Sequence, residues 1–260
     1  MSSDPVGGES WVKTEVKTDP VAAPFSGDTY IVFVLDRSSS MMIIRNPTVN
    51  AFNEWLQTQQ DVDADRAFFT LVLFNTDFQI PIKNADIKQV NPLTQERYAP
   101  SGMTRLYDAI AHGIETASNA MKPEDRAVVV VLTDGEENSS REYRTAESIK
   151  TLIQSYEARG NFTFTYMSSA PNAWQDAAKI GTQSGNTAVF AATPDGVTQG
   201  IGRASASLSS FRGQSAHSSD SFYGDAVPGV DDAPKSPTVA DFKKWSGRDL
   251  DEDKDNWKKP

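Results

Sequence analysis

Apolar runs of strand length alternate with segments of helical periodicity along most of the chain. TYIVFVLD at 29–36 is almost continuously apolar, which is typical of a strand buried on both faces of a sheet, and AVVVVL at 127–132 has the same character. After the first run, Val49, Phe52 and Leu56 recur at helical spacing and predict a crossover helix. The same patterns predict later helices with stripes starting at Leu106, Ile149 and Val197, and later strands at 162–167 and 186–191.

A hairpin is predicted between the first two helical segments. AFFTLVLFN at 67–75 and FQIPI at 78–82 are separated by only Thr76 and Asp77. Pro81 has no backbone N–H to give to a neighbouring strand, so the second strand is expected at an edge. Together with the alternation of strands and helices, this predicts an α/β fold. Its doubly wound, mostly parallel six-stranded sheet has helices on both faces and one antiparallel edge strand.

Periodicity is missing at both ends of the chain. Residues 1–27 are rich in Ser, Asp, Pro, Gly and Ala, and residues 213–260 form a low-complexity acidic segment. Segments with so few large apolar side chains bury too little surface to offset the entropy lost on ordering. We therefore expect a disordered N-terminal arm at 1–27, one domain at 28–212 and an unpacked C-terminal tail at 213–260.

Composition narrows the classes of function. The 260 residues carry 25 Lys and Arg against 35 Asp and Glu, a net charge of −10, which disfavours nucleic acid and anionic membranes as partners. With no Cys and only two His, disulfide frameworks, thiolate zinc sites and multi-His metal sites are excluded. No basic-then-apolar export signal and no apolar run of membrane-spanning length is present, so a cytoplasmic location is expected.

Polar side chains gather in three of the loops between the predicted elements. The first strand ends in Asp36-Arg37-Ser38-Ser39-Ser40, a loop before the second helix holds Ser101-Gly102-Met103-Thr104, and the strand at 127–132 is followed by Thr133-Asp134-Gly135. In doubly wound sheets, ligands bind beyond the carboxyl ends of the strands. An all-oxygen set with few carboxylates suits a hard cation, above all Mg²⁺, with Mn²⁺ or Ca²⁺ as alternatives. Capping of helices and turns by the same residues is the competing interpretation.

These three segments resemble the metal-ion-dependent adhesion site of von Willebrand factor type A (VWA) domains. DRSSS matches the D-x-S-x-S pattern of that family at Asp36, Ser38 and Ser40, GMTRLYDAI supplies its Thr at Thr104, and VVVLTDGEEN supplies its Asp at Asp134. The resemblance implies that all five side chains are metal ligands. It also implies that the metal accepts a carboxylate from a partner protein.

The resemblance covers about residues 28–212. Segments such as FVLDRSSSM and GNTAVFAATP are similar to those of small stand-alone cytoplasmic members in bacteria and their phages, which implies a host-cytoplasmic or virion location. Ser39 departs from the pattern, because relatives usually have Gly there, and a positive φ would strain Ser in this loop.

The main hypothesis is a metal-dependent protein-interaction module without catalytic activity and without a small-molecule substrate. One alternative is a structural component of a phage particle or complex, held by its tails. The other is a metal-dependent phosphoryl-transfer hydrolase. Such phosphatases need a second acid two residues after the nucleophilic Asp, and that place is Ser38 here. Phosphate-binding loops and a nucleophile elbow are also missing from the sequence.

Overall fold

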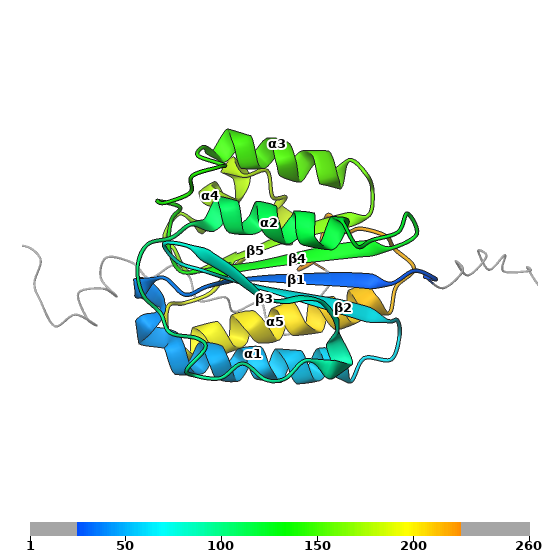
Figure 1. The fold of residues 1–260 in the computed structure, drawn as a ribbon, viewed down its shortest axis with the longest axis horizontal. Helices are drawn as coiled ribbons and strands as arrows, with labels where there is room; N and C mark the ends of the chain where they lie inside the picture. Colours follow the sequence, from blue (N-terminus) through cyan, green and yellow to red (C-terminus); the bar gives the residue numbers. More distant parts are fainter. Residues whose placement is uncertain (1–24, 225–260) are drawn as a thin grey trace, which may run out of the picture.

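The computed structural model describes residues 25–224, and the strands of this part form one sheet (Figure 1). Its strand order is β3-β2-β1-β4-β5-β6, with β3 antiparallel to β2 and all other neighbours parallel. The predicted doubly wound sheet with an antiparallel edge is therefore confirmed. The strands are β1 (Thr29–Asp36), β2 (Ala67–Phe74), β3 (Phe78–Asp86), β4 (Arg126–Thr133), β5 (Phe162–Ser168) and β6 (Thr187–Val189).

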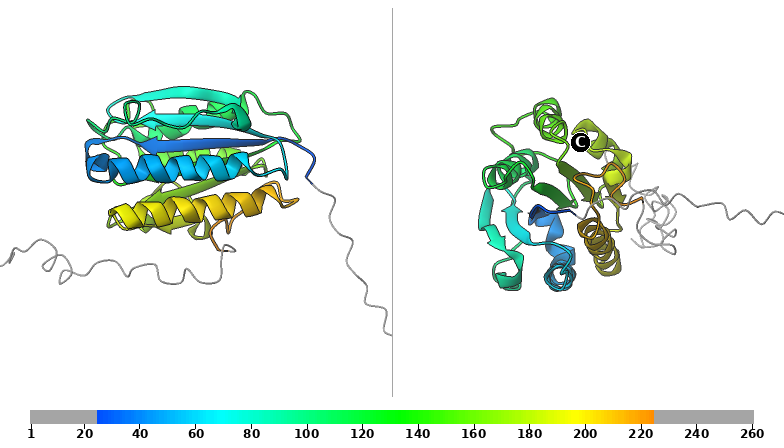
Figure 2. Two further views of the ribbon diagram at one scale, coloured as in Figure 1. Left: turned by 90° about the horizontal axis from the view of Figure 1, so that it is seen from below. Right: turned by 90° about the vertical axis from the view of Figure 1, so that its right-hand side faces the viewer.

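Helices cover both faces of the sheet (Figures 1 and 2). One face carries α1 (Arg45–Gln60) and α5 (Pro194–Arg212), and the other carries α2 (Leu106–Ser118), α3 (Ala146–Glu157) and α4 (Ala173–Lys179). Three short 3₁₀ turns complete the described part: η1 (Ser39–Ile44), η2 (Ile87–Gln89) and η3 (Ser184–Asn186).

Strand β1 shows why its sequence is continuously apolar. Ile31, Phe33 and Leu35 pack in the layer with α1 and α5, whereas Val32 and Val34 pack in the layer with α2. Successive side chains of a strand point to opposite faces, and here both faces are covered. Polar groups of the central strands are thereby confined to the strand ends.

Edge strand β3 runs to Asp86, four residues beyond the predicted segment at 78–82. Its side chains alternate between more and less exposed positions, as expected for a strand with one covered face. Asn84 takes a left-handed backbone conformation (φ 45°), donates its backbone N–H to Thr70 Oγ1 and its side-chain amide to Thr116 O. These long-range bonds extend the strand, and a short sequence window does not reveal them.

The C-terminal boundary predicted at 212 is too early. Residues 213–224 pack on the domain, where Phe222 and Tyr223 are buried in the layer of α5. The backbone N–H of Phe222 donates to Asn186 Oδ1 (2.8 Å), and that of Tyr223 donates to Gly185 O (2.9 Å). Two buried aromatic side chains thus hold the segment in place, although the sequence around them shows neither helical nor strand periodicity. Of the arms predicted at 1–27 and 213–260, residues 1–24 and 225–260 lie outside the described residues.

A buried ionic cluster holds the amino end of the sheet together. The Asp65 carboxylate contacts Arg212 Nε (2.7 Å) and Arg126 Nη2 (3.1 Å), and all three side chains are almost fully buried. Arg126 also donates to the carbonyl oxygens of Gln214 and Ala216, so the cluster ties β4 to the segment that follows α5.

Replacing Asp65 should destabilise the domain strongly. Asp65→Ala leaves two guanidinium groups buried without their carboxylate, and we expect the free energy of unfolding to fall by about 3–5 kcal/mol. Urea denaturation followed by circular dichroism measures this change. Asp63→Ala is the matched control, because Asp63 pairs with Lys88 on the surface and its loss should change stability little. Equal effects of both variants would contradict the assignment.

Candidate metal centre

The candidate residues lie beyond the carboxyl ends of β1 and β4, the two central strands between which the strand order reverses. Asp36 is the last residue of β1, and Asp134 follows the last residue of β4. The loops that carry them lie at the left end of the sheet in Figure 1. Such a reversal point is where open α/β sheets bind their ligands.

Asp36 is fully buried and held by two hydrogen bonds. Its Oδ1 accepts the backbone N–H of Ser38 (2.6 Å), and its Oδ2 accepts the hydroxyl of Thr133 (2.5 Å). Burial raises the pKa of Asp36 to about 7, although both hydrogen bonds act in the opposite direction. Within residues 25–224, no Lys, Arg or His side chain forms an ion pair with this carboxylate.

A series of side-chain contacts between oxygen atoms leads from Ser38 through Ser40 to Asp134. The hydroxyl oxygens of Ser38 and Ser40 are 3.0 Å apart, and Ser40 Oγ donates to Asp134 Oδ1 (2.5 Å). Burial raises the pKa of Asp134 as well. Asp134, like Asp36, has no ion-pair partner among the described residues. Two carboxylates are therefore held close together without a neutralising side chain.

Thr104 reaches the same place from a third loop. A Cβ atom added to Gly135 would lie 3.5 Å from Thr104 Oγ1 and 3.7 Å from Ser40 Oγ, so both hydroxyls border one space. The five side chains of the predicted site are thus brought to one end of the sheet. We call them the oxygen cluster: Asp36, Ser38, Ser40, Thr104 and Asp134.

The donor set of the oxygen cluster fits a hard divalent cation. Nowhere in the described part of the chain do three His, Cys, Asp or Glu side chains gather in a way that could hold a metal, so hydroxyl oxygens would have to complete any coordination here. Three hydroxyls and two carboxylates meet that requirement, and Mg²⁺ prefers oxygen ligands while keeping some of its water. Ser39 does not have a positive φ, so the departure from Gly at this position does not strain the loop.

Comparison with known families agrees with this fold. The model of the von Willebrand factor type A domain matches residues 31–201. The chain belongs to the VWA domain family. No curated protein matches it in sequence.

Solved structures share the fold at low sequence identity. The PilB minor pilin from Streptococcus sanguinis is 12% identical with a TM-score of 0.55, and the match covers 74% of this chain and 63% of the pilin, less than two thirds of its length. The pilus adhesin SpaC from Lactobacillus rhamnosus GG is 12% identical with a TM-score of 0.54, covering 71% of this chain and 30% of SpaC. Among the described residues, no helix is long and apolar enough to cross a bilayer.

Three residues that sequence analysis did not single out position the oxygen cluster of this VWA domain. Tyr98 donates its buried hydroxyl to Asp36 O (2.6 Å), and Thr133 bonds the Asp36 carboxylate. Asn138 holds Thr104 from both sides: its Oδ1 accepts the Thr104 N–H (2.8 Å), and its own N–H donates to Thr104 O (3.0 Å). Asn138 lies four residues after Asp134. The sequence did not reveal its role, because a run of polar residues such as this one is also typical of a solvated loop.

The loop after β4 is fixed to the start of α2 by a buried carboxylate. Asp108 accepts the backbone N–H groups of Arg141 and Tyr143 (both 2.8 Å) and the Nε of Arg105 (2.6 Å). Burial alone would raise the pKa of Asp108, but these bonds outweigh it and the pKa lies below its ordinary value. The loops that carry Thr104 and Asp134 are thereby fastened to each other.

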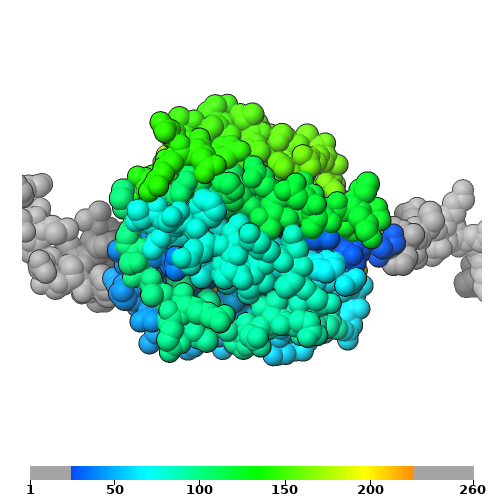
Figure 3. All heavy atoms as spheres, viewed as in Figure 1, coloured from blue at the N-terminus to red at the C-terminus, as the bar shows by residue number. Residues whose placement is uncertain are grey.

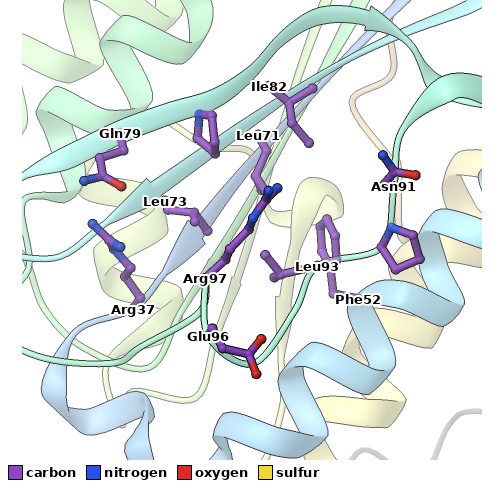
Figure 4. Close-up of a pocket in the computed structure, with 12 residues that line it drawn as sticks. Arg37, Phe52, Leu71, Leu73, Gln79, Ile82, Asn91, Leu93, Glu96 and Arg97 are labelled. Atoms are coloured by element: carbon purple, nitrogen blue, oxygen red, sulfur yellow. The ribbon is translucent and has the colours of Figure 1, made fainter.

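A pocket of about 320 Å³ adjoins the oxygen cluster on the face formed by β3 and the segment after it (Figures 3 and 4). Leu71 and Leu93 give it an apolar lining, and the charged side chains of Arg37, Glu96 and Arg97 also line it. Arg37 directly follows Asp36, yet no member of the oxygen cluster lines the pocket.

Neutralising Asp108 should destabilise the VWA domain in a pH-dependent way. Asp108→Asn replaces one of the two acceptor oxygens by an NH₂ group, which faces hydrogen-bond donors and cannot accept from them. We expect the free energy of unfolding to fall by about 2 kcal/mol at neutral pH. Because the folded pKa is lowered, the carboxylate stabilises the fold above the unfolded pKa of about 4 and loses this effect as the pH falls through the folded value. Urea denaturation at several pH values should show the difference from the wild type shrinking on acidification; a constant difference would contradict this role.

Proposed function

We propose that this VWA domain binds one divalent cation, Mg²⁺ in the first place, through the oxygen cluster and uses it to hold an acidic side chain of a protein partner. Mn²⁺ and Ca²⁺ are alternative ions. The carrying observation is the fully buried carboxylate of Asp36 beside the half-buried carboxylate of Asp134, neither of which has an ion-pair partner among the described residues. A buried charge needs compensation, and a cation supplies it.

Charge balance explains why the partner should be acidic. Two carboxylates neutralise a divalent ion, and the three hydroxyl ligands add no charge. The cation and its protein ligands together carry no net negative charge, so an incoming Asp or Glu is not repelled. Mg²⁺ also keeps water in part of its coordination shell, so a carboxylate can replace a water molecule without displacing a protein ligand. Nucleic acid, a membrane surface and a small-molecule substrate are not part of this proposal.

Binding is favoured over catalysis by the residues around Asp36. A phosphoryl-transfer mechanism of the kind considered above needs an acid where Ser38 stands, and the Ser38 hydroxyl instead lies 3.0 Å from Ser40 Oγ. The adhesin and pilin neighbours share the fold alone. The cytoplasmic or virion location and the structural role of the tails stay predictions.

Mg²⁺ should stabilise the folded chain through the oxygen cluster. We expect the melting temperature to rise with the logarithm of Mg²⁺ concentration above the dissociation constant, because the ion binds the folded state. Asp134→Asn and Gly135→Val should lower the Mg²⁺ affinity by roughly tenfold or more, the first by removing a charge and the second by filling the space between Ser40 and Thr104.

Differential scanning fluorimetry and titration calorimetry measure both effects. Asp63→Asn is the control for the loss of one negative charge, because Asp63 lies on the surface at the opposite end of the sheet and should bind Mg²⁺ as the wild type does. Unchanged affinity in Asp134→Asn would refute the metal site.

Thr104→Ala should separate partner binding from folding. Removing one hydroxyl ligand changes few core contacts but weakens the coordination that the partner completes, at a cost of about 1–3 kcal/mol in partner affinity. Affinity capture from native lysate, with Mg²⁺ or with chelator, should recover a protein on the wild type only with Mg²⁺ and recover less on Thr104→Ala. Capture that survives both chelation and Thr104→Ala would show that the interface lies elsewhere.

A further inference from the structure

Four large apolar side chains are exposed in the described part of the chain, and all four belong to loops or helix starts beyond the carboxyl ends of the strands. Their exposed fractions are 53% for Met42, 77% for Ile43, 48% for Met103 and 54% for Trp174. We call these four residues the apolar rim. The helix faces and the amino end of the described domain carry no such side chain.

Backbone contacts connect the apolar rim to the oxygen cluster. Met42 and Ile43 lie in η1, which also contains Ser40, and Met103 immediately precedes Thr104. The N–H of Ser39 donates to Gly102 O (3.1 Å), so η1 and the Met103 segment lie together. On the other side, Trp174 lies in the first turn of α4. Asn172, just before this helix, donates its side-chain Nδ2 to Glu136 Oε1 (3.4 Å), and Glu136 lies two residues after Asp134.

The fold holds these side chains outward rather than leaving them in a loose loop. In η1, Met41 and Ile44 are buried, which fixes the turn and leaves Met42 and Ile43 on its outer side. In α4, Ala173 and Ala177 are buried against the domain while Trp174 is exposed. A presentation this fixed costs little further entropy on binding.

Single exposed apolar side chains are normal on protein surfaces, but their collection at one end is not. Met and Trp are also among the residue types enriched at the centres of interfaces, where adaptable or large side chains lose water on contact. Each of the four belongs to a segment that carries a member of the oxygen cluster or is bonded to a loop that does, so the apolar rim and the cluster lie at the same end of the domain. A second copy is a poor occupant, because each chain carries a net charge of −10.

We infer that the partner segment carries large apolar side chains next to its acidic residue, and that these side chains pack on the apolar rim while the acid reaches the metal. The inference rests on the proposed function and adds to it the chemistry of the partner. The metal selects for the carboxylate, and the rim selects for Phe, Leu, Trp or Met beside it.

A random-peptide display library supplies the probe. Selection on the immobilised full chain in Mg²⁺ should enrich peptides with an Asp or Glu flanked closely by large apolar residues. The strongest selected peptide is then synthesised, and its affinity is measured by fluorescence polarisation. We expect Trp174→Gln and the double variant Met42→Gln/Ile43→Gln each to weaken it on the order of 5- to 30-fold, the range for central interface residues. Lys122→Gln, an exposed change at the amino end of β4, is the matched control and should bind normally.

Methionine oxidation reports contact at the rim directly. In the free full chain, hydrogen peroxide should oxidise Met42 and Met103 quickly, and the peptide should protect both. Met41 and Met167 are fully buried and serve as internal controls that should stay unreactive in either state. Slow oxidation of Met42 and Met103 in the free chain would show that another part of the same chain covers the rim, and would overturn the inference.

The selections separate failure of this inference from failure of the proposed function. Mg²⁺-dependent peptides with an acid but no apolar preference, unaffected by the rim variants, would overturn the rim and leave the metal-dependent function standing. Apolar acidic peptides that bind equally in chelator and lose affinity in the rim variants would support the rim and refute the metal. Failure to enrich any peptide in Mg²⁺ would overturn both.

Discussion

Both faces of the sheet are covered by helices, and this constraint confines the polar chemistry of the central strands to their two ends. The strand interiors must be apolar on both sides, as the alternating partners of Ile31 and Val32 show. At the amino end, the buried Asp65 carboxylate is compensated by two guanidinium groups. At the carboxyl end, Asp36 and Asp134 have no such compensation within residues 25–224, and this imbalance favours a cation there.

The loops at the carboxyl end are held in place by hydrogen bonds within the chain itself. Tyr98 fixes the backbone at Asp36, Asn138 fixes Thr104 on both sides, and Asp108 fastens the start of α2 to the loop after β4. Side chains held this way lose little freedom on coordinating an ion or a partner. Separate contacts keep the exposed apolar side chains outward: buried Met41 and Ile44 fix η1, and buried Ala173 and Ala177 fix α4.

Sequence analysis was accurate where local pattern and strand order determine position. Every predicted helix stripe lies in a helix, every predicted strand overlaps a strand, and Pro81 lies in the edge strand as expected. The last strand is shorter than predicted, because only Thr187–Val189 of the segment 186–191 is extended and paired. The five candidate residues could be named because three segments resemble the adhesion site of VWA domains, and residues after parallel strands are expected to converge at one edge. The end of β3 and the packing of residues 213–224 were not foreseen, because Asn84 and Phe222 act through partners far away in the chain.

The sequence by itself determined the fold class and the acidic charge, because these follow from periodicity and composition. The five candidate oxygen donors came from the resemblance of three segments to the adhesion site of VWA domains, and their role as metal ligands stays a prediction. Only the tertiary structure decided that Asp36 is buried and Asp134 half-buried, both without ion-pair partners in the described part of the chain. It also decided that Asn138 and Tyr98 position the cluster, and that the exposed apolar residues lie at the same end of the sheet. Burial, pairing and shared surfaces depend on which distant segments meet, and a one-dimensional pattern does not contain that information.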